Sequence, residues 1–170
     1  MLVTLRIIHI LSAAVLVGSV FFNYFLLRPA LRLIPPAHAV VVAQRVGTVF
    51  TYSGWAALIL LFLSGALRLP SLTVIFQPDF YTAGYGRAVA LMIFLWFLTV
   101  VSSTIMTFVL RPKLMRKLTV NSNPTLADVE KRRADQIAAS TWLDRLQLAN
   151  VITSTLALIA GASGVYGGLF

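Results

Sequence analysis

A seven-residue pattern occurs twice in this chain, and its two copies lie 83 positions apart. They are Phe25–Leu31 (FLLRPAL) and Phe108–Leu114 (FVLRPKL). In each copy a long apolar run reaches an Arg-Pro pair, and proline lacks the N–H that a continuing helix would use. The long arginine side chain can meanwhile reach the phosphates of lipid headgroups. The pattern predicts two related helix pairs in a membrane, with the first helix of each pair ending at its Arg-Pro.

The composition supports a membrane protein. Of the 170 residues, 59% are hydrophobic and only 11% are charged, whereas about a quarter of the residues of a soluble domain are charged. Four apolar stretches are long enough to cross a bilayer, which takes about 20 helical residues. We expect one all-α domain over residues 1–170, a bundle of four transmembrane helices in two parallel-related pairs. The expected helices are approximately 3–27, 37–68, 87–110 and 125–167, with the second and fourth extending into the cytoplasm.

The positive charges predict the orientation. Eleven of the 14 lysines and arginines lie in the loops 28–49 and 111–145. Loops rich in lysine and arginine stay in the cytoplasm, so both termini are expected outside. The net charge of +9 is then explained by topology and by anionic lipids at the cytoplasmic face, with no nucleic-acid partner. The absence of cysteine excludes disulfides and thiolate metal sites.

His9 is the main candidate for chemistry, because an ionisable residue inside a membrane span is a functional hypothesis by default. Arg6, Ser12, Ser19 and Asn23 fall on the same side of the expected helix as His9. This polar face should point into the bundle or into a cavity. The alternative is that His9 only hydrogen-bonds a backbone carbonyl or a hydroxyl. Arg6 could hold a haem propionate or a lipid phosphate.

The repeat adds Met92 as a second candidate. His9 lies 19 residues before Arg28, and Met92 lies 19 residues before Arg111. The two side chains should therefore lie at a similar depth. A neutral imidazole and a thioether could ligate haem iron or copper. Alternatively, Met92 fills core space.

Small residues mark the fourth helix. Ala160, Gly164 and Gly168 form a ladder in which every fourth residue is small. Such ladders let helix backbones approach closely in lipid. The ladder predicts either packing within the bundle or a face for a homo-oligomer or a larger membrane complex.

Three short motifs give the chain a family resemblance. They are the stretch His9–Gly18 (HILSAAVLVG), the Arg28-Pro29 exit and Leu63–Ala66 (LSGA). On these the chain resembles the CopD-like superfamily of four-helix bacterial membrane proteins, which includes copper-resistance domains. HemJ-type protoporphyrinogen oxidases are similar in layout, and there a first-helix histidine is associated with haem b. The resemblance implies the bacterial cytoplasmic (inner) membrane and haem b or copper at His9.

Three functions remain open. The first is a CopD-like protein that binds haem b or a metal through His9, for electron transfer or for haem or copper handling. The second is a non-catalytic accessory or scaffold subunit of a membrane complex, and the third is a small-solute transporter along the Arg6–His9–Asn23 face. Val17 replaces the tryptophan expected before Gly18, and no lysine lies between Arg87 and Arg111. These departures argue against a porphyrinogen oxidase, and the sequence leaves open whether the protein is an enzyme.

Overall fold

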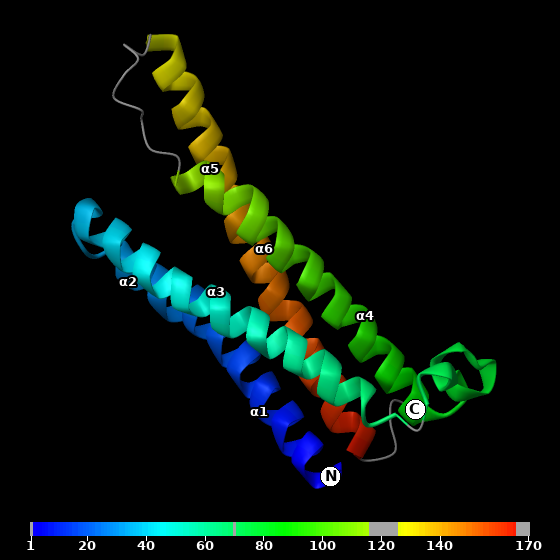
Figure 1. Cartoon of the computed structure of the whole chain (residues 1–170). Coiled ribbons are helices and arrows are strands. Elements are labelled where there is room, and N and C mark those ends of the chain that lie inside the picture. The colour runs from blue at the N-terminus through cyan, green and yellow to red at the C-terminus, as the bar shows by residue number, and fades with distance from the viewer. Residues whose placement is uncertain (1, 70, 116–125, 166–170) are drawn as a thin grey trace.

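The computed structural model describes residues 2–69, 71–115 and 126–165, and all regular structure in these ranges is helical (Figure 1). Four spans are long and apolar enough to cross a membrane. The α-helices are α1 (Leu2–Phe21), α2 (Arg28–Leu31), α3 (Pro36–Ala66), α4 (Gly84–Thr104), α5 (Arg111–Met115) and α6 (Leu126–Val165). The described residues also form two π-helices, η1 (Phe22–Leu27) and η4 (Ile105–Leu110). They form two 3₁₀ helices as well, η2 (Leu72–Phe76) and η3 (Pro78–Tyr81).

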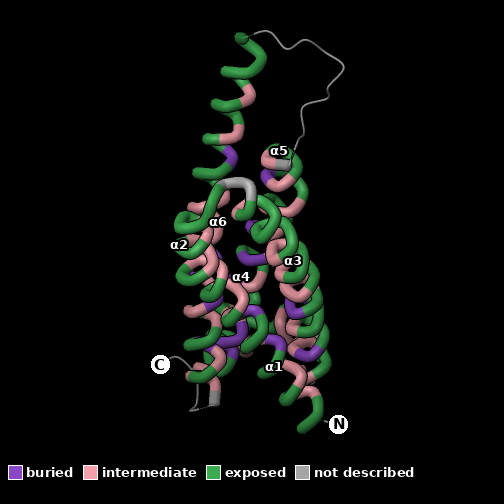
Figure 2. The backbone as a smooth tube through the Cα atoms, turned by 90° about the vertical axis from the view of Figure 1, so that its left-hand side faces the viewer, coloured by how far each residue is buried: buried purple, intermediate pink, exposed green. Residues whose placement is uncertain are grey.

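The helices form two antiparallel pairs. α1 packs mainly against α3, and α4 packs mainly against α6. The first residue of α1 and the last residue of α6 lie at the same end of the bundle, which we call the terminal end (Figures 1 and 2). The opposite end holds Arg28 and Arg111 and is called the arginine end. At 40 residues, α6 is about 60 Å long, roughly twice the hydrocarbon thickness, and it extends beyond the other helices at the arginine end (Figure 2).

The prediction that the first helix of each pair ends at its Arg-Pro is wrong. Each helix continues past the proline through a π turn, η1 before Arg28 and η4 before Arg111. The Arg28 N–H donates to the Asn23 carbonyl, and the Arg111 N–H donates to the Met106 carbonyl, a step of five residues in both. A proline ring clashes with the carbonyl four residues before it. The wider turn accommodates that ring without ending the helix.

The π turns also decide which way the two arginines face. In α1, Ser12 and Leu16 are buried, and Ser19 and Asn23 continue the same face. An α-helix would next place Leu27 on this face, but the five-residue step places Arg28 above Asn23. The second copy repeats this pattern, with Leu95, Thr99 and Ser102 buried, then Met106, then Arg111. Both arginines therefore face the neighbouring helices.

The core lies between the two pairs, and apolar surface covers the outside. Leu16, Ala57 and Leu58 form a buried cluster, against which Trp96 packs while its Nε1–H donates to the Leu58 carbonyl at 3.1 Å. Buried residues line the inner faces of the helices, and exposed residues cover the outer faces (Figure 2). Among the exposed side chains are Phe62, Phe94 and Phe108. A surface this apolar fits lipid, because a soluble protein exposes such patches only in small areas.

Candidate functional site

His9 lies on α1 near the terminal end, against the last turns of α3. Its Nδ1 is 2.9 Å from the Ser64 hydroxyl oxygen. A Cβ atom added to Gly65 would lie 3.4 Å from the imidazole Cε1, so the ring rests on the bare surface of this glycine. The side chain is half-buried, while Ser64 is only 2% exposed. Both neighbours of the ring belong to the Leu63–Ala66 motif of α3.

Ser64 lies between His9 and the backbone of its own helix. Its hydroxyl oxygen is 2.6 Å from the Leu60 carbonyl oxygen and 3.3 Å from the Leu61 carbonyl oxygen. When the hydroxyl donates to one of these carbonyls, its oxygen accepts from an Nδ1–H of His9; in the other tautomer the hydroxyl donates to Nδ1. In either case the hydrogen bond at Nδ1 orients the ring, as a supporting hydrogen bond orients a metal-ligating histidine.

The structure places Met92 in the other helix pair. A Cβ atom added to Gly161 of α6 would lie 3.3 Å from the Met92 sulfur. The contact of Met92 with Gly161 thus repeats the contact of His9 with Gly65. Met92 lies 83 positions after His9, and Gly161 lies 96 positions after Gly65. The two contacts are equivalent in the repeat, and the similar depth of the two side chains in a membrane stays a prediction. His9 and Met92 each face the glycine of their own pair, and neither of these contacts brings them to one site.

Arg6 lies one turn before His9 on α1 and is exposed. Of the predicted polar face, Ser12 is 5% exposed, and Ser19 and Asn23 are half-buried. The Asn23 amide donates to the Ser19 carbonyl at 2.9 Å. This face thus points inward from Ser12 onward, whereas Arg6 stands at its exposed end.

A metal bound at this position would have His9 as a ligand. Among the described residues no group of three or more His, Asp or Glu side chains could hold a metal ion. A closed metal site built from such ligands is therefore not formed by the described part of the chain. The imidazole of His9 would supply one nitrogen ligand to haem iron or to copper, both of which imidazole suits.

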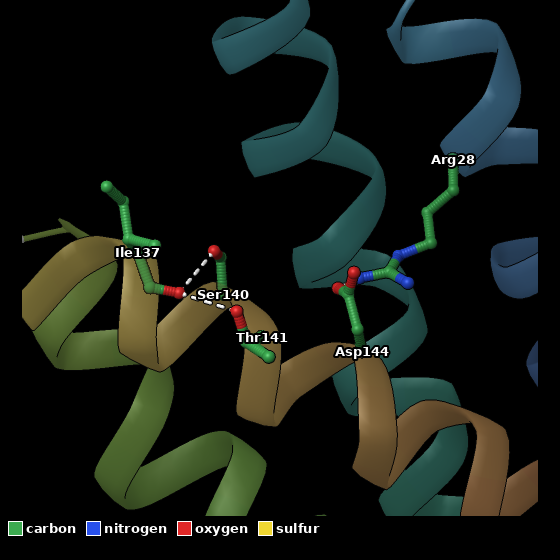
Figure 3. A network of polar contacts seen from close by, with 5 residues as sticks. All are labelled: Arg28, Ile137, Ser140, Thr141 and Asp144. Atoms are coloured by element: carbon green, nitrogen blue, oxygen red, sulfur yellow. Dashed lines mark hydrogen bonds and ion pairs between the residues drawn. The ribbon is translucent and has the colours of Figure 1, made fainter.

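A second polar site joins the two pairs at the arginine end. Arg28 forms an ion pair with Asp144 of α6, where the Ser140 and Thr141 hydroxyls donate to the Ile137 carbonyl nearby (Figure 3). Arg111 instead reaches α3: its two terminal nitrogens donate to Thr51 at 2.8 Å and Thr48 at 2.7 Å.

The two arginine contacts are equivalent. Thr48 and Asp144 are 96 positions apart, the same spacing as Gly65 and Gly161. Each arginine thus crosses from the first helix of its own pair to the second helix of the other pair. This reciprocal exchange is what a two-fold axis along the bundle would produce. The sequence prediction missed these contacts, although the 83-residue repeat of the arginines was the signal for them.

The small residues of α6 contribute to packing inside the chain. Ala160 is 1% exposed, and a Cβ atom added to Gly164 would lie 3.9 Å from a ring carbon of Tyr85 on α4. For Ala160 and Gly164, these contacts agree with packing within the bundle, which is one of the two roles predicted for the small residues. Gly168 lies outside the described residues.

Comparison with protein-family models, with curated proteins and with solved structures finds no match to this chain. Its function must therefore be inferred from the residues of the two sites described above.

Proposed function

We propose that this protein is a CopD-like integral membrane protein that binds haem b or copper through His9 and serves electron transfer or haem or copper handling. The observation that carries the proposal is the hydrogen bond between the His9 Nδ1 and the buried Ser64 hydroxyl at 2.9 Å, which orients the imidazole through one of its two nitrogens. A bound haem or copper ion would supply one-electron redox chemistry. His9 would be the ligand, Ser64 would orient its ring, and Arg6 would offer its guanidinium to a haem propionate.

The surroundings of His9 support a ligand role. Its ring is half-buried, and its Nδ1 contacts a hydroxyl that is also hydrogen-bonded to the backbone of α3. The ring thus has a supporting partner at one nitrogen. Such supporting hydrogen bonds typically contribute about 10–100-fold to metal affinity.

The visible absorption spectrum of the detergent-purified protein, oxidised and dithionite-reduced, tests the proposal. We expect a Soret band and reduced α/β bands, or copper on metal analysis of the same sample. His9→Ala should remove either signal. Ser64→Ala should weaken binding roughly 10–100-fold, because the ring loses its hydrogen-bond partner.

Two variants control for indirect effects. Ser53→Ala removes a hydroxyl that donates within α3, to the Phe50 carbonyl, and should leave binding unchanged. Met92→Leu should also retain the signal, since the sulfur contacts Gly161 of the other pair. A featureless spectrum and no copper in folded protein expressed with ample haem would contradict the proposal.

We also propose the bacterial inner membrane as the location, with loops 28–49 and 111–145 in the cytoplasm and both termini outside. The support is the concentration of eleven of 14 basic residues in these loops, since such loops stay in the cytoplasm. Because the chain contains no cysteine, single cysteines make clean reporters. Thr73→Cys and Ala134→Cys introduce them in η2 and α6, outside the apolar parts of the spans.

A membrane-impermeant maleimide applied to intact spheroplasts should label the Thr73→Cys variant and not the Ala134→Cys variant. The second variant should react only after the membrane is permeabilised. The reverse pattern would invert the topology.

The scaffold function is the second candidate, and the extension of α6 favours it. Toward the arginine end this helix exposes Ile137 and Trp142, at 59% and 55%. Large exposed apolar side chains in a polar stretch are typical of binding surfaces. If the protein co-purifies with stoichiometric membrane subunits and carries no chromophore or copper, the scaffold function is the better account.

A further inference from the structure

We propose that a cleft at the arginine end binds the phosphodiester of an anionic phospholipid through Arg32 and Arg28. The cleft has a volume of about 260 Å³ and is lined by Tyr24, Phe25, Arg28, Pro29 and Arg32. It lies where the first helix passes its Arg-Pro, at the end of a span long enough to cross a membrane. Headgroup phosphates are expected at this depth.

The charges of the cleft fit a single negative charge. Arg28 pairs with Asp144, so these two side chains neutralise one another. Arg32 adds a second guanidinium to the lining of the same cleft. The three groups together carry one excess positive charge, which a phosphodiester monoanion would balance. Guanidinium groups bind phosphate oxygens through paired, charge-assisted hydrogen bonds.

Apolar surface beside the two arginines suits the rest of a lipid. Phe25 forms one wall of the cleft and is 53% exposed, and the adjacent Leu26 is 61% exposed. Their exposure leaves these side chains open to the surroundings of the bundle, where acyl chains would lie. A free phosphate ion would use the arginines but gain nothing from this apolar wall.

The second copy of the repeat provides an internal comparison. The residues equivalent to Tyr24 and Arg32 are Thr107 and Met115. Arg111, the equivalent of Arg28, has both terminal nitrogens bonded to threonine hydroxyls, and Thr107 accepts from the Trp55 indole at 3.4 Å. In the second pair, this helical turn thus contacts neutral side chains of a neighbouring helix. In the first pair, the equivalent turn contributes two arginines to a cleft. The difference in residues points to an additional ligand at the first copy.

Native mass spectrometry of the full chain in a neutral detergent tests the proposal. Short-chain phosphatidylglycerol, phosphatidylcholine and inorganic phosphate are titrated separately. We expect one phosphatidylglycerol to bind roughly tenfold more tightly than phosphatidylcholine. Arg32→Gln should weaken phosphatidylglycerol binding about tenfold, the effect of one charge-assisted pair. Arg28→Lys, which keeps the charge beside Asp144, should weaken it less.

Arg45→Gln is the matched control, because Arg45 is exposed near the same end of the bundle and its loss changes the net charge equally. It should leave the affinity unchanged. Equal weakening by Arg32→Gln and Arg45→Gln would mean diffuse attraction and would overturn the proposal. Equal binding of the two lipids would do the same. Phosphate that displaces phosphatidylglycerol at a similar affinity would show a free-anion site and overturn the lipid assignment.

Discussion

Replacing Gly86 by alanine should destabilise the protein more than any other single methyl addition at a glycine of the described helices. A Cβ atom at this position would lie 1.7 Å from the Phe80 carbonyl oxygen and 2.7 Å from its carbon. The clash involves backbone, so the η3 segment must move away from the start of α4. We expect the free energy of unfolding to fall by on the order of 3 kcal/mol, measured as a lower thermal midpoint in detergent.

Glycines with free space around them provide the control. At Gly18, Gly47 and Gly54 an added Cβ meets nothing within 4 Å. Alanine there should be neutral or stabilising by up to about 1 kcal/mol, since alanine is the better helix former. A stability of Gly86→Ala equal to that of these three variants would contradict the packing of η3 against α4.

The Arg28–Asp144 ion pair should be the main electrostatic link between the two helix pairs. Its side chains are 23% and 42% exposed, so its strength should lie between that of surface pairs and that of buried pairs. We expect Arg28→Gln and Asp144→Asn each to lower the free energy of unfolding by about 1–2 kcal/mol. The double variant should cost less than the sum, because either single change already breaks the pair.

Arg111→Gln is the comparison for Arg28→Gln, because Arg111 occupies the equivalent position in the repeat but contacts uncharged partners. This variant removes hydrogen bonds to the neutral hydroxyls of Thr48 and Thr51. Raising the salt concentration should therefore reduce the effect of Arg28→Gln and leave the effect of Arg111→Gln unchanged. Additive effects of Arg28→Gln and Asp144→Asn, or the same salt response at both arginines, would contradict the assignment.

The two pairs differ in the side chains at equivalent inner positions. Thr99 and Thr153 share a hydrogen bond of 3.0 Å in the second pair. The equivalent residues of the first pair, Leu16 and Ala57, belong to the apolar cluster. The two pairs thus keep one backbone plan but have diverged in chemistry at several positions. The clearest divergence is at the terminal end, where one pair places an imidazole on its glycine and the other places a thioether.

Part of the candidate site could be predicted from the sequence. His9 stands out in the sequence because it is an ionisable side chain in an apolar span, and the repeated arginines match Met92 to it. Ser64 stands out only as part of a small-residue motif. Its role depends on the alignment of α1 with α3, 55 residues apart along the chain. No local pattern encodes that alignment.

The sequence by itself determined the four apolar helices, their grouping into two related pairs and the basic end of the bundle. These features follow from the length and composition of each segment, so they need no knowledge of neighbours. Only the tertiary structure decided where the repeated arginines go and which residues lie against His9. The π turns before Pro29 and Pro112 rotate both arginines inward, and their partners lie on helices of the other pair. Such contacts depend on helix register and packing, which act between residues far apart in the chain.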